Sequence, residues 1–168
     1  MPMVTRSPEE TRRLGAALAA SLQAGDVLLL LGDLGAGKSE FTRGIARGLG
    51  IGGPIASPSF TILNLYEEGR LPLCHFDWYR LSGAEELWDM GLEEYLGGDG
   101  VAVVEWPERC PEALPEDHLA VRITPLPDGS RDFRFTPMGR FRAIPGFTDE
   151  APPPGDKPAP PVDTLCKD

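Results

Sequence analysis

The residues best suited to chemistry form a glycine-rich loop, Gly32 to Ser39, that fits the pattern Gly-x-x-x-x-Gly-Lys-Ser. In this pattern backbone N–H groups surround the phosphates of a nucleotide, Lys38 reaches the β- and γ-phosphates, and the Ser39 hydroxyl binds Mg²⁺. The alternative is a glycine-rich turn that opens an ordinary helix. The apolar run before the loop and the helical pattern after it disfavour that alternative. The residues expected to bind the nucleotide here are Asp33, Leu34, Gly35, Ala36, Gly37, Lys38 and Ser39.

Two carboxylates stand where strands are expected to end. Glu105 follows a short apolar run, and Asp77 lies near the end of an expected strand over residues 71–78. In a chain with a phosphate-binding loop, such carboxylates hold Mg²⁺, directly or through water, or orient the attacking water. The alternatives are a solvated carboxylate at Glu105 and a surface ion pair of Asp77 with Arg80 or Arg43.

Length and composition predict one soluble domain with a tail. The formal charge of −10 and the pI near 4.7 argue against direct binding of nucleic acid, which draws on Lys and Arg. Three cysteines without CxxC spacing indicate reduced thiols and a cytoplasmic location, and no apolar run approaches the roughly 20 residues of a membrane span. We expect a domain over residues 1–147 and a proline-rich, disordered tail over residues 148–168.

The hydrophobic periodicity predicts an α/β fold around the loop. Ser7 and Glu10 form a predicted capping box that opens a helix ending at Gly25, and Ser82 and Glu85 form a second box that opens a short helix. Two pairs of alternating runs predict antiparallel hairpins, so the sheet is expected to be mixed. The expected strands are 27–31, 60–66, 71–78, 101–104, 119–124 and 132–136, and the remaining helical segments are 38–50 and 92–96.

Five motifs in order make the chain recognisable. They are Gly-Asp-Leu-Gly-Ala-Gly-Lys-Ser at 32–39, Ser-Pro-Ser-Phe-Thr at 57–61, His-Phe-Asp-Trp-Tyr-Arg-Leu at 75–81, Glu-Glu-Leu at 85–87 with Met-Gly at 90–91, and Val-Glu-Trp-Pro at 104–107. With these motifs the chain resembles the bacterial TsaE (YjeE) family over about residues 7–136. That family is the ATPase component of the machinery that makes threonylcarbamoyladenosine (t6A) next to the anticodon of tRNA.

The resemblance implies a P-loop NTPase-like mixed α/β sheet flanked by helices, which binds ATP and Mg²⁺ and hydrolyses ATP slowly alone. It also implies a complex with the TsaB and TsaD proteins, through which tRNA is met only indirectly, with no membrane or DNA partner. By matching position, Lys38 and Asp77 are implied in catalysis, and Ser39 and Glu105 are implied as Mg²⁺ ligands.

Further positions carry weaker matches to the family. Residues 57–61 resemble a switch-like segment near the γ-phosphate, and Ser7 and Arg131 fall near positions that contact the nucleotide in relatives. The chain departs from the family pattern at Ser59, where Thr is expected, and at Trp78, where Leu is common. Ser59 keeps the hydroxyl, whereas Trp78 adds bulk.

Other protein classes share the loop. A small-molecule kinase needs an acceptor site and usually an arginine-bearing lid, and the sequence has no arginine-rich insertion. A GTPase needs an Asn-Lys-x-Asp motif, but the only asparagine, Asn64, is followed by Leu65. Residues 81–85 superficially match a transporter ATPase signature, although the strand before Glu105 lacks the paired Asp-Glu ending of that class. A nucleotide-gated interaction module without significant turnover is the alternative that the sequence does not separate from an ATPase.

Overall fold

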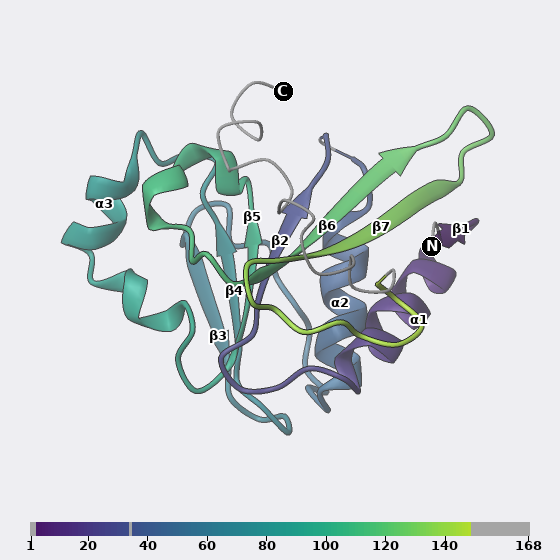
Figure 1. Ribbon diagram of the computed structural model, residues 1–168, viewed down its shortest axis with the longest axis horizontal. Coiled ribbons are helices and arrows are strands. Elements are labelled where there is room, and N and C mark those ends of the chain that lie inside the picture. The colour runs from purple at the N-terminus through teal and green to yellow at the C-terminus, as the bar shows by residue number, and fades with distance from the viewer. Residues whose placement is uncertain (1–2, 34, 149–168) are drawn as a thin grey trace.

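The computed structural model of the chain describes residues 3–33 and 35–148 (Figure 1). Its strands are β1 (Met3–Thr5), β2 (Val27–Leu31), β3 (Leu63–Tyr66), β4 (Leu73–Asp77), β5 (Val101–Glu105), β6 (His118–Pro125) and β7 (Arg131–Met138). Its helices are α1 (Pro8–Ala19), α2 (Lys38–Gly48) and α3 (Ala84–Asp89), with the 3₁₀ helices η1 (Leu92–Tyr95), η2 (Pro107–Arg109) and η3 (Pro111–Ala113). The predicted tail, residues 148–168, lies outside the described residues except for its first residue.

A mixed sheet of seven strands in the order β1-β7-β6-β2-β5-β4-β3 organises the fold. β2, which leads into the glycine-rich loop, lies between β5 and β6 and runs parallel to both, and β4 runs parallel to β5. β3 and β7 pair antiparallel with β4 and β6, so both predicted hairpins are confirmed. The carboxyl ends of β2, β5 and β4 therefore lie at one edge of the sheet, which is where ligands bind in open α/β sheets.

Both faces of the sheet are covered (Figure 1). Leu28 and Leu30 of β2 pack in one hydrophobic cluster with residues of α1 and α2, whereas Val27 and Leu29 pack on the opposite face with residues of α3. A strand that is buried on both faces needs no polar side chains. This explains why β2 is a continuous apolar run, and it confirms the predicted sheet flanked by helices.

α1 and α2 lie side by side and touch at their backbones (Figure 1). A Cβ atom at Gly44 would lie 2.1 Å from the carbonyl oxygen of Arg12, and one at Gly15 would lie 2.4 Å from that of Phe41. Any side chain at either position would force the helices apart, so glycine is required there. The contact fixes the start of α1 relative to the start of α2.

The predicted boundary of α1 is confirmed at its start and wrong at its end. Ser7 is the N-cap residue, and its Oγ accepts a hydrogen bond from the Glu10 N–H at 3.1 Å. The helix ends at Ala19 rather than at Gly25. Leu22 lies beyond that end and is still buried in the core, so its hydrophobic spacing reflected tertiary packing rather than a longer helix.

Two other local predictions are wrong. The predicted capping box of α3 does not form, because the N-cap residue is Gly83 and the Ser82 hydroxyl bonds to the Glu86 carboxylate instead of Glu85. The expected strand 60–66 is shortened to Leu63–Tyr66, since Ile62 adopts a left-handed backbone with φ of 68°. Strand β1, which no pattern predicted, pairs antiparallel with β7.

Candidate functional site

The glycine-rich loop connects the carboxyl end of β2 to the first residue of α2. Gly35 and Gly37 have φ angles of 82° and 111°, which are left-handed conformations that glycine adopts without strain. α2 begins at Lys38 and is preceded by Gly37 without a side-chain cap, so the first N–H groups of the helix are free to bind an anion. The loop and start of α2 border a cavity of about 390 Å³, within the range of small-ligand sites.

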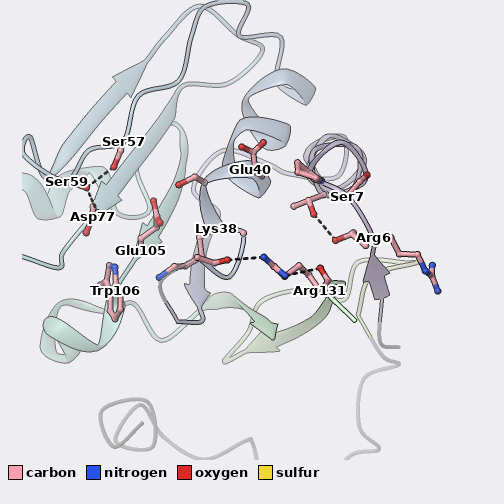
Figure 2. A pocket seen from close by; sticks show the side chains of 17 residues that line it. Arg6, Ser7, Lys38, Glu40, Ser57, Ser59, Asp77, Glu105, Trp106 and Arg131 are labelled. Atoms are coloured by element: carbon pink, nitrogen blue, oxygen red, sulfur yellow. Dashed lines mark hydrogen bonds between the residues drawn. The ribbon is translucent and has the colours of Figure 1, made fainter. Parts of the chain in front are cut away.

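The cavity brings together most of the residues predicted to bind a nucleotide or a metal (Figure 2). Its lining includes Ser7, Gly35, Gly37, Lys38, Ser39, Asp77, Glu105 and Arg131. Asp33 and Ala36 belong to the same loop but are not among the lining residues, and Ala36 is fully buried in the core. Leu34 lies outside the described residues.

The two predicted carboxylates end neighbouring parallel strands and are placed opposite each other in register, Asp77 on β4 and Glu105 on β5. Each is only 7% exposed, so neither is a solvated surface carboxylate. The predicted alternative of an ion pair with Arg80 or Arg43 is wrong: the Arg80 guanidinium lies over the Phe60 ring, and Arg43 pairs with Glu40. Both carboxylates instead face the cavity.

Asp77 is held through both of its carboxylate oxygens. Oδ1 accepts a hydrogen bond from the backbone N–H of Tyr79 at 2.9 Å, and Oδ2 accepts one from the Ser59 hydroxyl at 3.3 Å. The Ser57 and Ser59 hydroxyls lie 2.8 Å apart, which extends the hydrogen bonds into the segment predicted to be switch-like (Figure 2). Ser59 therefore links this segment to Asp77.

Lys38 is 5% exposed, and its ammonium lies 4.0 Å from the centroid of the Trp106 ring. Burial lowers the pKa of Lys38, and the nearby negative charges, of which Glu105 acts most strongly, oppose that shift. The face of an aromatic ring attracts a cation, so Trp106 stabilises the desolvated ammonium. Lys38 thus presents a charge to the cavity with little solvent around it.

Ser7 and Arg131 approach the loop from elements far away in the sequence (Figure 2). The Arg131 guanidinium donates to the carbonyl oxygens of Gly35 at 3.2 Å and Gly129 at 3.0 Å. The Ser7 hydroxyl accepts from the Glu10 N–H, so it caps α1 while lining the cavity. Pairing of β1 with β7 places residues 5 and 131 opposite each other and accounts for this approach.

Trp106, which lines the cavity, and His75, which bonds a lining residue, had no role in the sequence prediction, although both lie within quoted motifs. Trp106 contacts Lys38 and has a left-handed φ of 59°, which is rare for a residue with a bulky side chain. His75 places its Nε2 atom 2.6 Å from Glu105 Oε2. The sequence did offer a signal for both. Trp106 directly follows Glu105, and His75 lies two residues before Asp77, so each stands next to a predicted site residue.

Trp78, the departure from the family pattern, lies away from the cavity. Its side chain is fully buried on the α3 face of the sheet and packs edge-on against Phe76, with ring centroids 5.8 Å apart. The added bulk therefore fills the hydrophobic core.

The donor atoms at the loop fit Mg²⁺ that arrives with a nucleotide. Ser39 and Glu105 both line the cavity and offer oxygen atoms, which Mg²⁺ prefers. Across residues 3–33 and 35–148, no three His, Cys, Asp or Glu side chains gather into a metal-binding group. Mg²⁺ is commonly held by one or two carboxylates together with substrate phosphates, so this sparse donor set suits it.

No helix in the described parts of the chain is long and apolar enough to cross a membrane.

Comparison with known proteins gives a consistent family. The family model described as "Threonylcarbamoyl adenosine biosynthesis protein TsaE" matches residues 5–133. The tRNA threonylcarbamoyladenosine biosynthesis protein TsaE of Bacillus subtilis is 47% identical over 135 residues, covering 80% of this chain and 84% of its own. The TsaE protein of Treponema pallidum is 44% identical over 132 residues, covering 79% and 97%. The crystal structure of Bacillus subtilis YdiB is similar with a TM-score of 0.70 and 42% identity, covering 83% of this chain and 86% of that chain.

Proposed function

Because the chain belongs to the TsaE family of threonylcarbamoyl adenosine biosynthesis proteins, we propose that it is the ATP-binding and ATP-hydrolysing component of the complex that forms t6A in tRNA. The observation that carries this proposal is the cavity at the start of α2, which Lys38, Ser39, Asp77 and Glu105 line together. These residues supply the cation, the hydroxyl and the two carboxylates that phosphoryl transfer to water requires.

ATP binding is assigned to the loop and the start of α2. The free N–H groups of the loop and of the first turn of α2 bind the phosphates, and Lys38 adds a point charge at the β- and γ-phosphates. Ser7 and Arg131 border the same cavity from the other side, and we assign them contacts with the nucleotide.

Hydrolysis is assigned to the strand ends. Mg²⁺, bound by Ser39 and Glu105 together with ATP, would neutralise charge that develops on the phosphates. Asp77 then orients the attacking water through a carboxylate oxygen. Its two oxygens offer about four acceptor sites, of which the hydrogen bonds from Tyr79 and Ser59 use two.

The proposal extends to the partners TsaB and TsaD. A net charge of −10 disfavours direct binding of tRNA, because nucleic-acid binding relies on Lys and Arg contacts with phosphates. We therefore propose that the chain acts on tRNA only through the TsaB and TsaD proteins, in the cytoplasm.

The test measures phosphate release by the purified chain, alone and with TsaB and TsaD from the same organism. We expect slow release alone and faster release with the partners, together with t6A formation on tRNA by the full set. ATP binding without added turnover in the complete set would favour a nucleotide-gated interaction module. Turnover that requires a small-molecule acceptor would favour a kinase, and either result would overturn the assigned hydrolysis.

A further inference from the structure

His75 is a buried polar residue without a task in the function proposed above. It lies on β4, two residues before Asp77, and is 2% exposed. Its Nε2 atom lies 2.6 Å from Glu105 Oε2, whereas its Nδ1 atom has no hydrogen-bond partner in the part of the chain that the structure describes. An ionised carboxylate can only accept hydrogen bonds. Nε2 therefore carries the proton and donates a hydrogen bond to Glu105.

The hydrogen bond engages one carboxylate oxygen and leaves the other available. Glu105 Oε1 forms no hydrogen bond with any side chain or backbone group of the described residues, and Glu105 lines the nucleotide cavity. His75 does not line that cavity; it borders a narrow recess with Ser39 and Ser57. His75 can therefore influence the cavity only through its neighbours, of which Glu105 is the one it bonds.

We propose that His75 is a positioning residue, whose Nε2–H holds Oε2 of Glu105 and so keeps Oε1 available to Mg²⁺ bound with ATP. This inference rests on the proposed function, because it assumes that Glu105 binds the metal. The last torsion of a glutamate side chain has no sharp preference of its own, so a partner is needed to fix the carboxylate plane.

Lys38 explains why such a partner is needed. Among the charges around the Lys38 ammonium, Glu105 acts most strongly. If the Glu105 carboxylate were free to rotate, it would turn toward this ammonium. The resulting ion pair would take Glu105 away from the metal and Lys38 away from the phosphates. His75, which does not itself line the cavity, holds the carboxylate through the bond between Nε2 and Oε2.

The experiment compares two amide substitutions that differ in reach. The side-chain amide of His75→Gln extends about as far from the backbone as Nε2 of histidine, whereas that of His75→Asn extends only as far as Nδ1. Binding of a fluorescent ATP analogue is titrated with Mg²⁺ for both variants and the unaltered chain. Loss of a partner that orients a metal ligand typically costs about 10-fold to 100-fold in metal affinity.

We expect His75→Asn to raise the Mg²⁺ concentration for half-maximal binding about tenfold or more, and His75→Gln to stay within about threefold of the unaltered chain. Binding of the analogue without Mg²⁺ should be unchanged in both. The matched control is His118→Asn, since His118 is equally buried but bonds the Pro115 carbonyl outside the cavity. Thermal denaturation of each variant reports folding.

A second measurement uses the unaltered chain and does not depend on whether a variant folds. We expect the ring ¹⁵N resonances of His75 to show a protonated Nε2 and to shift when Mg²⁺ is added to the chain with bound ATP, while those of His118 stay in place. An unshifted His75, or equal Mg²⁺ requirements for the Gln and Asn variants, would overturn the positioning role. If the unaltered chain binds ATP with no dependence on Mg²⁺, the proposed function itself fails instead.

Discussion

The two sides of the cavity at the start of α2 are built differently. On the strand side, Asp77 and Glu105 end adjacent parallel strands, are only 7% exposed and are fixed by hydrogen bonds from neighbouring residues. The other side, called the hairpin side here, consists of Ser7 at the start of α1 and Arg131 at the start of β7 in the β6–β7 hairpin. Ser7 is exposed and Arg131 is half-buried, and the Arg131 guanidinium donates to two backbone carbonyls. The strand side is therefore suited to chemistry, which needs fixed geometry, and the hairpin side to the adjustable contacts that we propose with the nucleotide.

Lys38→Ala should have the largest effect, because Lys38 stands between the two sides and is proposed to serve both binding and hydrolysis. We expect ATP turnover to fall by a factor on the order of 10² to 10³, and ATP affinity to fall with it. The ammonium lies over the Trp106 ring at the cavity, so its removal should leave the hydrophobic core in place and the fold should persist. Phosphate release with the partner proteins measures turnover, and Arg134→Ala, an exposed cation on β7, is the control. Undiminished turnover would contradict the role of the loop.

Asp77→Asn should separate chemistry from binding. We expect hydrolysis in a single turnover to fall about 10²-fold, because an amide cannot accept a proton from water or polarise it. ATP affinity should stay the same or rise slightly, since a negative charge beside the phosphates is removed. Asp132→Asn is the control, because Asp132 pairs with Arg134 and does not line the cavity. Loss of ATP binding instead of hydrolysis would mean that the strand side serves binding and that the comparison is reversed.

Substitutions on the hairpin side should have the smallest effects. We expect Arg131→Ala to weaken ATP binding by several-fold without changing the rate of the bound state, as removal of an exposed contact commonly costs about 1 kcal/mol. Ser7→Ala should act similarly and also lower the free energy of unfolding by about 1 kcal/mol, because it removes the cap of α1. Titration with the ATP analogue and chemical denaturation measure the two effects. A drop in hydrolysis as large as that of Asp77→Asn would remove the distinction between the sides.

The strand side could be predicted from the sequence because its geometry follows from local patterns. Apolar runs mark buried parallel strands, and parallel strands place their final residues at one edge of the sheet. Glu105 and Asp77 accordingly end adjacent strands and line one cavity with the loop. The central strand, the loop and the helix after it follow from one motif.

The remaining features depend on contacts between distant segments. The three residues of β1 are too few to form a pattern, and only their pairing with β7 places Ser7 and Arg131 at one cavity. The end of α1 was misjudged because Leu22 is buried by tertiary packing after the helix has ended. The bond between His75 and Glu105 requires knowledge of which strands are neighbours, which the order of motifs does not provide.

The backbone contact between α1 and α2 has an electrostatic consequence. Both helices begin at the cavity, α1 at Ser7 and Pro8 and α2 at Gly37 and Lys38. The aligned peptide dipoles of a helix place about half a positive charge at its N-terminal end, and the packing at Gly15 and Gly44 keeps these two ends together. The two helix ends thereby add a positive contribution at the cavity of a chain whose net charge is −10, which would favour the approach of the polyphosphate that we propose as its ligand. Substituting either glycine would separate the two helix ends and weaken this contribution, without altering any side chain that lines the cavity.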